Sequence, residues 1–296
     1  MATRFEAVLW GASEERLRAA GEEALAEIQR CEALLSRFLP GSDIYEVNAR
    51  AADQFVRVDP RVLALLDRVR VLHDASHGAF DITVGPLRRA WGFDGATGSV
   101  PAPEALERAR AVVGMNLIEL AAAYMSVRFL KPGVELDLGA IGKGYAVERA
   151  AEVIREAGVP GALIHGGTST VQAIGHAPDG NPWRVGVRHP NDPSDTVGVA
   201  YLEECALSVS APHGKAFRAD GRQYGHVLDP RRGCPVEGAL LAAVRCPSAT
   251  DSDALSTALL VLGEAFAEEL ADGPFNAACL LCVGADELER VVATAW

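Results

Sequence analysis

The stretch Glu135-Leu136-Asp137-Leu138-Gly139-Ala140-Ile141-Gly142-Lys143-Gly144-Tyr145-Ala146 decides how this chain folds. Over residues 134–138 apolar residues alternate with acidic ones, and a period of two predicts a strand. Three glycines follow within six residues, and apolar residues then recur at helical spacing from Ala146 onward. The sequence therefore predicts a strand, a glycine-rich turn and a helix in immediate succession.

The turn in this stretch has the features of an anion-binding site. Backbone N–H groups at a helix N-terminus lack partners within the helix, and the helix dipole favours negative charge there. Asp137 breaks the Gly-x-x-x-x-Gly-Lys-Ser/Thr pattern, and Gly142-Lys143-Gly144 does not extend to Gly-x-Gly-x-x-Gly. A phosphate-type site and a plain strand-to-helix turn both remain open at this point.

The composition limits the classes of partner. The chain has 296 residues, of which 49% are hydrophobic and 23% are charged, and this fits one large domain or two intertwined lobes. The net charge of −12 argues against nucleic acid as a partner, since the sequence contains no basic patch. An anionic ligand must therefore be held by local N–H groups, a metal ion or single Lys and Arg residues.

Cysteine usage and the N-terminus predict a cytoplasmic location. The six cysteines show no zinc-type pairing with histidines, and Cys279-Leu-Leu-Cys282 lies in an apolar run, which favours reduced core cysteines. The segment Met1–Glu6 has no basic region followed by an apolar one, as a secretory signal would. No apolar run approaches the ~18 residues that a membrane-spanning helix needs, so we expect no membrane span.

The rest of the chain mixes helices and strands without a regular alternation. Helices are expected from Ser13 to Phe38, over 42–48, after Asp59-Pro60, over 103–112, 144–157, from 247–253 to Leu262, over 264–271 and at the C-terminus. Strands are expected over 4–10, 117–121, 125–130, 161–167, 183–187, 197–203, 206–210, 239–245 and 277–283. This mixture predicts an α+β fold.

Two groups of residues are candidates for chemistry. Asp253 and Thr257 stand four apart at a helix start and share a face, where their oxygens suit Mg²⁺ or Ca²⁺. The alternative is that Asp253 only favours the helix dipole and Thr257 is solvated. His226 lies beside the turn residue Asp229 and is a candidate general base, the alternative being a structural histidine.

Other residues carry a weaker signal. Asp81 lies in a glycine-flanked loop, where aspartate is usually a turn former. Gly166-Gly167 ends a predicted strand and permits either close approach of a ligand or a tight turn. From the residues alone, we expect a soluble α+β protein with a candidate phosphate or nucleotide site and a candidate metal site, and the alternatives given above stay open.

Six motifs, taken in chain order, resemble the FAD:protein FMN transferase family, the ApbE or thiamine-biosynthesis lipoprotein family. They are Leu35–Phe38 with Ser42–Ile44 and Asn48, His77–Leu87 with Trp91–Phe93, Glu135–Ala146, Gly166-Gly167, His226–Pro230 with Gly233, and Asp253–Ala258 with Val261–Gly263. Each motif is weak alone, and their common order over nearly the whole chain makes the resemblance specific.

The resemblance implies a T-fold-like α+β core, with mixed antiparallel sheets flanked by helices, that binds FAD. It implies a single domain over 1–296, with two lobes and the flavin site between them. Mg²⁺ would be held by the backbone carbonyl of Ala140 and by the side chains of Asp253 and Thr257. The residues implied to contact FAD are Asp81, Lys143, Gly166, Gly167, Ser208 and Val227. His226 would be the catalytic base.

The implied reaction is Mg²⁺-dependent transfer of FMN from FAD to a Ser or Thr hydroxyl of an acceptor flavoprotein, with release of AMP. Hydrolysis of FAD to FMN and AMP is the alternative, and non-catalytic FAD binding is a third reading. The chain departs from the family pattern at Ala2, where Gly is usual, and at Thr168-Ser169, where Asp-Ile is usual. A usual Tyr is also missing after Ser208, and His213 falls close to its place.

Overall fold

The computed structural model describes residues 3–95, 98–192, 194–212, 216–285 and 288–296. The chain divides into two compact units, and each combines segments that are distant in sequence. The first unit contains Met1–Glu32, Ile141–Ala211 and Gly238–Trp296, and the second contains Ala33–Ala140 and Pro212–Glu237. The prediction of one domain with a flavin site between two lobes stays a prediction.

The first unit is built on a seven-stranded sheet in which every neighbouring pair of strands is antiparallel. In spatial order the strands are β1 (Phe5–Trp10), β5 (Gly161–Gly166), β6 (Thr170–Ile174), β9 (Ala206–Ser210), β14 (Ala239–Cys246), β15 (Ala278–Ala285) and β16 (Leu288–Thr294). Because β5 and β6 are hydrogen-bonded neighbours joined by a short turn, Gly167 takes a positive φ of 67°.

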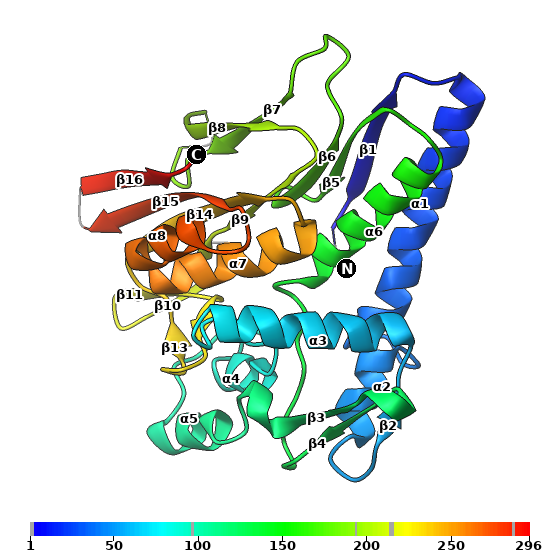
Figure 1. Cartoon of the computed structure of the whole chain (residues 1–296). Coiled ribbons are helices and arrows are strands. Elements are labelled where there is room, and N and C mark those ends of the chain that lie inside the picture. Colours follow the sequence, from blue (N-terminus) through cyan, green and yellow to red (C-terminus); the bar gives the residue numbers. More distant parts are fainter. Residues whose placement is uncertain (1–2, 96–97, 193, 213–215, 286–287) are drawn as a thin grey trace. The chain divides into compact units, whose positions relative to one another are not determined.

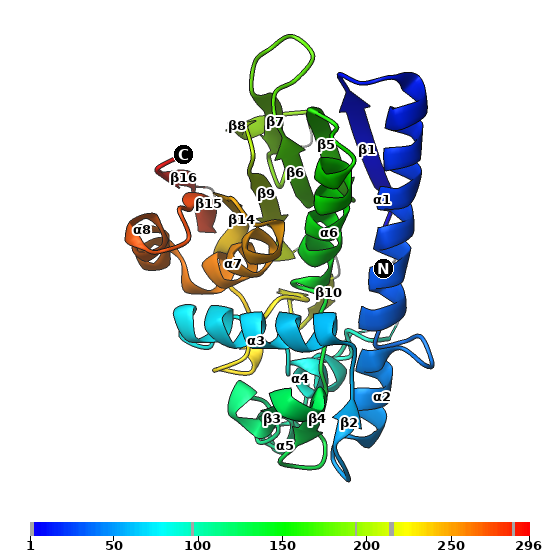
Figure 2. The same ribbon diagram turned by 45° about the vertical axis from the view of Figure 1, so that its right-hand side comes forward.

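Helices cover one face of this sheet. They are α1 (Glu14–Leu35), α6 (Gly142–Glu156), α7 (Ala249–Leu262) and α8 (Glu264–Asp272). Figures 1 and 2 show α6 and α7 side by side along the sheet. Ile28 of α1 and Ile154 of α6 pack with Ile164 of β5 in one buried cluster. The apolar spacing that predicts α6 from the sequence is therefore the face that α6 turns to the sheet.

A two-stranded hairpin packs on the opposite face of the sheet. It consists of β7 (Trp183–Arg188) and β8 (Thr196–Leu202), which bury Trp183 and Leu202 with Leu163 and Leu207 of the sheet. Residue 163 thus points to the hairpin while its neighbour Ile164 points to the helices. Burial on both faces explains why β5 is a continuous apolar run rather than an alternating one.

Among its described residues, the second unit contains helices, one small sheet and two hairpins. Its helices are α2 (Asp43–Arg50), α3 (Pro60–Ala75), α4 (Gly85–Ala90), α5 (Pro103–Arg110), η1 (Met115–Leu117) and η2 (Ala122–Tyr124). Its strands are β2 (Val56–Arg57), β4 (Ser126–Phe129) and β3 (Ile118–Ala121) in one sheet, β10 (Ala216–Ala219) with β11 (Arg222–Gly225), and β12 (Leu228–Asp229) with β13 (Cys234–Pro235). The helices predicted over 42–48 and after Asp59-Pro60 are confirmed, and each begins at a side-chain cap, because Ser42 accepts from the Tyr45 N–H and Asp59 from the Arg61 N–H.

The strand predicted over 134–138 is wrong. The side chains of this segment do alternate in burial, with Val134, Leu136 and Leu138 buried. The backbone forms no β-ladder, however, because the Asn48 side chain occupies the hydrogen-bonding groups of Leu136. The Leu136 N–H donates to Asn48 Oδ1 at 2.7 Å, and the Leu136 carbonyl accepts from Asn48 Nδ2 at 3.0 Å. An apolar alternation shows which side chains are inside, and it does not show that a neighbouring strand is present.

The predicted C-terminal helix is also wrong, because residues 288–294 form strand β16. Val291 and Val292 lie opposite Cys282 and Leu281 of β15. Adjacent β-branched residues favour a strand, and β15 offers them an open row of hydrogen-bonding groups. Strand β6 (Thr170–Ile174), which was not predicted from the sequence, lies inside the same sheet between β5 and β9.

The cysteines behave as the composition predicts. All six lie within the described residues and form no disulfide. Cys279 and Cys282 are buried in β15, where burial raises the pKa of the Cys279 thiol to about 12. Over the described ranges, none of the helices combines the length and the apolar character needed to cross a bilayer.

Candidate functional site

The first turn of α6 meets the carboxylate of Asp253 on α7. The helix begins at Gly142, two residues before the predicted start, and Ile141 at its N-cap provides no side-chain cap. The Gly144 N–H donates instead to Asp253 Oδ2 at 3.0 Å, and Lys143 Nζ lies 3.3 and 3.4 Å from the two carboxylate oxygens. The Asp253 residue is only 3% exposed. A buried negative charge thus occupies the positive end of the α6 dipole.

Gly144 is required by packing between these two helices. A Cβ atom at this position would lie 2.1 Å from the Ala249 carbonyl oxygen and 2.7 Å from Asp253 Cβ. Glu148, one turn further along α6, accepts from the Ser248 hydroxyl at 2.7 Å and the Thr250 N–H at 2.8 Å. The absence of a side chain at Gly144 therefore admits the neighbouring helix α7 at close range.

A chain of buried hydroxyl groups leads from the sheet to Asp253. Ser208 on β9 donates to Thr170 Oγ1 on β6 at 3.3 Å, and Thr170 lies 3.5 Å from Asp253 Oδ1. Ser208 is 0% exposed, and Thr170 links it to Asp253. The contact of Ser208 with FAD stays a prediction.

Thr257 lies one turn after Asp253 on α7. Its hydroxyl contacts Ser210 Oγ at 3.1 Å and lies 3.4 Å from the Asp253 backbone carbonyl. Ser210 also contacts Ser256, at 2.8 Å. The two side chains predicted to bind metal therefore share one face of α7, as their spacing predicts.

Gly166 and Gly167 are explained by their neighbours. A Cβ at position 166 would lie 2.9 Å from Val147 Cγ2, and one at position 167 would lie 2.3 Å from Thr3 Oγ1. The Gly167 N–H donates to the Arg4 carbonyl at 2.9 Å. Packing against α6 and against the residues just before β1 accounts for both glycines, and their predicted contact with FAD stays a prediction.

Asp81, His226, Val227 and Ala140 belong to the second unit. His226 Nδ1 lies 3.2 Å from the Pro212 carbonyl oxygen. A carbonyl only accepts, so this contact assigns the ring proton to Nδ1 and leaves Nε2 as the basic nitrogen of the neutral ring. The carbonyl of Val227 accepts from the Val236 N–H at 3.0 Å.

The turn after Val227 is locked by one ion pair. The Asp229 carboxylate accepts from Arg231 at its backbone N–H, Nε and Nη2, at 3.0, 2.9 and 2.8 Å. Burial alone would raise the pKa of Asp229, but the hydrogen bonds and the charge of Arg231 hold this pKa below its ordinary value. The Asp229–Arg231 pair thus stabilises the turn that follows the His226 segment.

Asp81 forms the turn that its residue type predicts. Its Oδ1 accepts from the Thr83 N–H at 2.7 Å and the Thr83 hydroxyl at 2.6 Å, and its Oδ2 lies 3.4 Å from His73 Nδ1. Burial raises the pKa of Asp81, while Thr83 and His73 oppose the shift. The predicted role in binding FAD is untested by these contacts.

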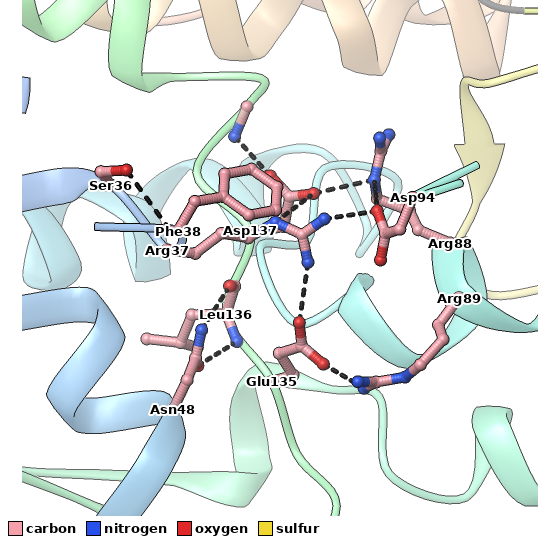
Figure 3. A network of polar contacts seen from close by, with 11 residues as sticks. Ser36, Arg37, Phe38, Asn48, Arg88, Arg89, Asp94, Glu135, Leu136 and Asp137 are labelled. Atoms are coloured by element: carbon pink, nitrogen blue, oxygen red, sulfur yellow. Dashed lines mark hydrogen bonds and ion pairs between the residues drawn. The ribbon is translucent and has the colours of Figure 1, made fainter. Parts of the chain in front are cut away.

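An ion-pair cluster that was not predicted from the sequence surrounds the residues before the glycine turn (Figure 3). Its members, termed here the arginine–carboxylate cluster, are Arg37, Arg88, Arg89, Asp94, Glu135 and Asp137. The side chain of Arg37 is 8% exposed. Its Nη2 forms an ion pair with Asp94, and its Nη1 lies 2.7 Å from Glu135 Oε1. Arg88 Nε lies 2.8 Å from Asp137.

This cluster bears directly on the turn, because Asp137 Oδ1 also accepts from the Gly139 N–H at 2.8 Å. Ala140, the predicted carbonyl ligand, is the next residue in the chain. Arg37 lies about 100 residues before its partner Glu135, so no local pattern predicts that they pair. In the sequence, the acidic residues Glu135 and Asp137 beside the glycine turn were the feature that could have indicated arginine partners.

The described residues contain no cluster of three or more His, Cys, Asp and Glu that would hold a metal ion. Asp253 is the single carboxylate among the three predicted ligands, and the others are a hydroxyl and a backbone carbonyl. Such a set needs further oxygens from a ligand or water to complete the coordination of a hard cation. His213 and Ala2 lie outside the described residues.

Comparison with known proteins gives the family. The ApbE family model matches residues 1–281. The FAD:protein FMN transferase of Treponema pallidum is 31% identical over 264 residues, which cover 83% of this chain and 72% of that protein. The FAD:protein FMN transferase of Klebsiella pneumoniae is 30% identical over 279 residues, 91% of this chain and 79% of that protein.

A solved structure agrees with these relatives. The crystal structure of the ApbE protein of Thermotoga maritima is 28% identical, with a TM-score of 0.86 over 99% of this chain and 97% of that chain. The predicted α+β fold and the predicted enzyme family are both confirmed. This chain is a member of the ApbE family.

Proposed function

We propose that this chain transfers FMN from FAD to a Ser or Thr hydroxyl of an acceptor protein, with release of AMP, in a Mg²⁺-dependent reaction. The observation that carries the proposal is the family match over residues 1–281, with relatives at least 30% identical that are named FAD:protein FMN transferase. The buried Asp253 at the α6 N-terminus supports the metal dependence.

The proposed metal ligands fit a hard cation by their chemistry. Asp253 and Thr257 present a carboxylate and a hydroxyl from one face of α7, and Ala140 adds a backbone carbonyl. Mg²⁺ in proteins is commonly held by one or two carboxylates together with phosphate oxygens. When bound, Mg²⁺ would neutralise the FAD pyrophosphate and polarise the phosphoryl group.

His226 is the proposed base. With Nδ1 donating to the Pro212 carbonyl, Nε2 takes the proton of the acceptor hydroxyl. The hydroxyl oxygen then forms a bond to the FMN phosphorus, the bond between the two phosphates breaks, and AMP leaves with its own phosphate. Lys143, Asp81, Gly166, Gly167, Ser208 and Val227 are the residues proposed to bind FAD.

The test is an incubation of the purified chain with FAD, Mg²⁺ and candidate acceptor proteins. We expect flavin fluorescence on the acceptor band of a denaturing gel, together with one AMP per flavin transferred. Free FMN and AMP without labelled acceptor would show an FAD pyrophosphatase instead. Bound yellow FAD without any AMP would show a non-catalytic flavin-binding protein.

The cytoplasmic location stays a prediction.

Thr257 offers a second test within the proposal. Thr257→Val removes the hydroxyl and keeps the shape, whereas Thr257→Ser keeps the hydroxyl. We expect the Mg²⁺ concentration for half-maximal activity to rise by about tenfold or more in the valine variant. The serine variant is expected to stay within about threefold of the parent chain, and equal behaviour of both variants would remove Thr257 from the proposed ligand set.

A further inference from the structure

The Asp253 carboxylate is compensated by the ammonium group of Lys143. The Asp253 side chain is 4% exposed and that of Lys143 is 25% exposed. The ammonium nitrogen lies 3.3 Å from one carboxylate oxygen and 3.4 Å from the other. An uncompensated carboxylate buried to this degree is strongly unfavourable, so the lysine charge stabilises Asp253 in its place on α7.

The contact is loose for an ion pair. Charge-assisted N–H···O bonds are usually about 2.7–2.9 Å long, and Arg231 reaches Asp229 at 2.8 and 2.9 Å in the same chain. Among the described residues, the shortest hydrogen bond to the Asp253 carboxylate comes from the Gly144 N–H, at 3.0 Å. The contact of Lys143 with Asp253 is thus longer than a usual charge-assisted hydrogen bond, and the ammonium group is carried on a flexible four-carbon stem.

We infer that Lys143 is a positioning residue that occupies the cation place at Asp253 until a divalent cation binds, and that it then leaves the carboxylate. The inference rests on the proposed function, since it takes Asp253 as a metal ligand. An ammonium group and a divalent cation on the same carboxylate would repel each other strongly at this burial. The Gly144 N–H, which carries no net charge, keeps its bond to Oδ2 and holds the carboxylate in place.

This role differs from two simpler ones in a measurable way. If Lys143 only stabilised the fold, its removal would lower stability and leave cation affinity unchanged or weaker. If it only contacted FAD, its removal would change neither quantity in the absence of FAD. A residue that competes with the cation has the opposite signature, because its removal makes the cation bind more tightly.

The experiment measures Mn²⁺ and Mg²⁺ binding to the full chain by calorimetry, without FAD. For Lys143→Met we expect about tenfold tighter binding than in the parent chain, and a larger rise of Tm on adding Mg²⁺. Lys131→Met removes the same charge from a lysine that donates to the Ala111 carbonyl, and it should change the affinity less than about twofold. Lys143→Arg keeps the charge in a planar fork that grips a carboxylate more tightly, and it should weaken cation binding.

Asp253→Asn separates the two possible failures. If this variant loses the cation while Lys143→Met binds it no more tightly than the parent chain, the inference on Lys143 is overturned and the proposed metal site stands. If the parent chain and Asp253→Asn bind the cation equally, the metal site itself is wrong, and the inference falls with it. Should Lys143→Met not fold, an affinity of Lys143→Arg equal to that of the parent chain would overturn the inference.

Discussion

Gly144 in α6 lies so close to Ala249 in α7 that a Cβ atom at position 144 would stand 2.1 Å from the Ala249 carbonyl oxygen. The same glycine donates its N–H to Asp253, one turn further along α7. One residue without a side chain thus permits both the helix contact and the hydrogen bond that positions the carboxylate. Backbone atoms cannot move aside as a flexible side chain can, so this contact tolerates no substituent.

Gly144→Ala is therefore expected to destabilise the chain by about 2–3 kcal/mol through overpacking. Gly21→Ala is the matched control, because Gly21 also lies in a helix and its added Cβ would meet only Leu9 Cδ1, at 3.8 Å. Alanine there should stabilise by about 0.5–1 kcal/mol, since it has the higher helix propensity. Urea unfolding of both variants measures the difference, and equal effects at the two sites would contradict the packing argument.

Arg37 is expected to be the most important member of the arginine–carboxylate cluster. Arg37→Met leaves Asp94, Glu135 and Asp137 with two arginines instead of three, and Arg37 is only 8% exposed. Breaking a buried ion pair from one side typically costs about 3 kcal/mol or more. In contrast, Arg18→Met breaks the exposed pair of Arg18 with Glu14 and should have no measurable effect. A similarly small loss for Arg37→Met, measured by chemical unfolding, would show that the cluster contributes little.

The lowered pKa of Asp229 predicts a pH dependence of stability with a definite sign. Because the folded state lowers this pKa below its ordinary value of 3.8, the stabilisation is present above that pH. It is lost as the pH falls through the lower pKa of the folded state. Asp229→Asn should thus lose about 1–2 kcal/mol at pH 7, and the gap to the parent chain should close in acid. A gap that stays constant from pH 7 to pH 2.5 would contradict this assignment.

The sequence alone predicted most helices and strands of this chain, because their signals are local. The caps at Ser42 and Asp59 and the apolar face of α6 follow from residue types within a few positions of each other. The strand expected at 134–138 failed for a non-local reason, since Asn48 takes the hydrogen bonds that a neighbouring strand would need. The expected C-terminal helix failed similarly, because β15 provides a partner that no local pattern reveals.

In the candidate site, too, the local features were predictable from the sequence and the non-local contacts were not. The shared face of Asp253 and Thr257 follows from a spacing of four, and the structure bears it out. The pairing of Asp253 with Lys143, 110 residues away, requires the packing of two helices and has no signature in either segment. The cluster around Arg37 is another pairing of this kind, since it joins residues about 100 positions apart.

His226 provides the sharpest test of the proposed chemistry. His226→Asn keeps an N–H donor near the place of Nδ1 for the Pro212 carbonyl, and it removes the basic Nε2. Loss of a general base typically lowers a rate by about 10²–10⁴-fold, so we expect that loss of FMN transfer with Tm and FAD affinity nearly unchanged. His189→Asn is the control, because His189 accepts from two loop N–H groups through Nδ1 and has no role in the proposal. Full transfer activity in His226→Asn, measured by flavin fluorescence on the acceptor, would place the base elsewhere in the chain.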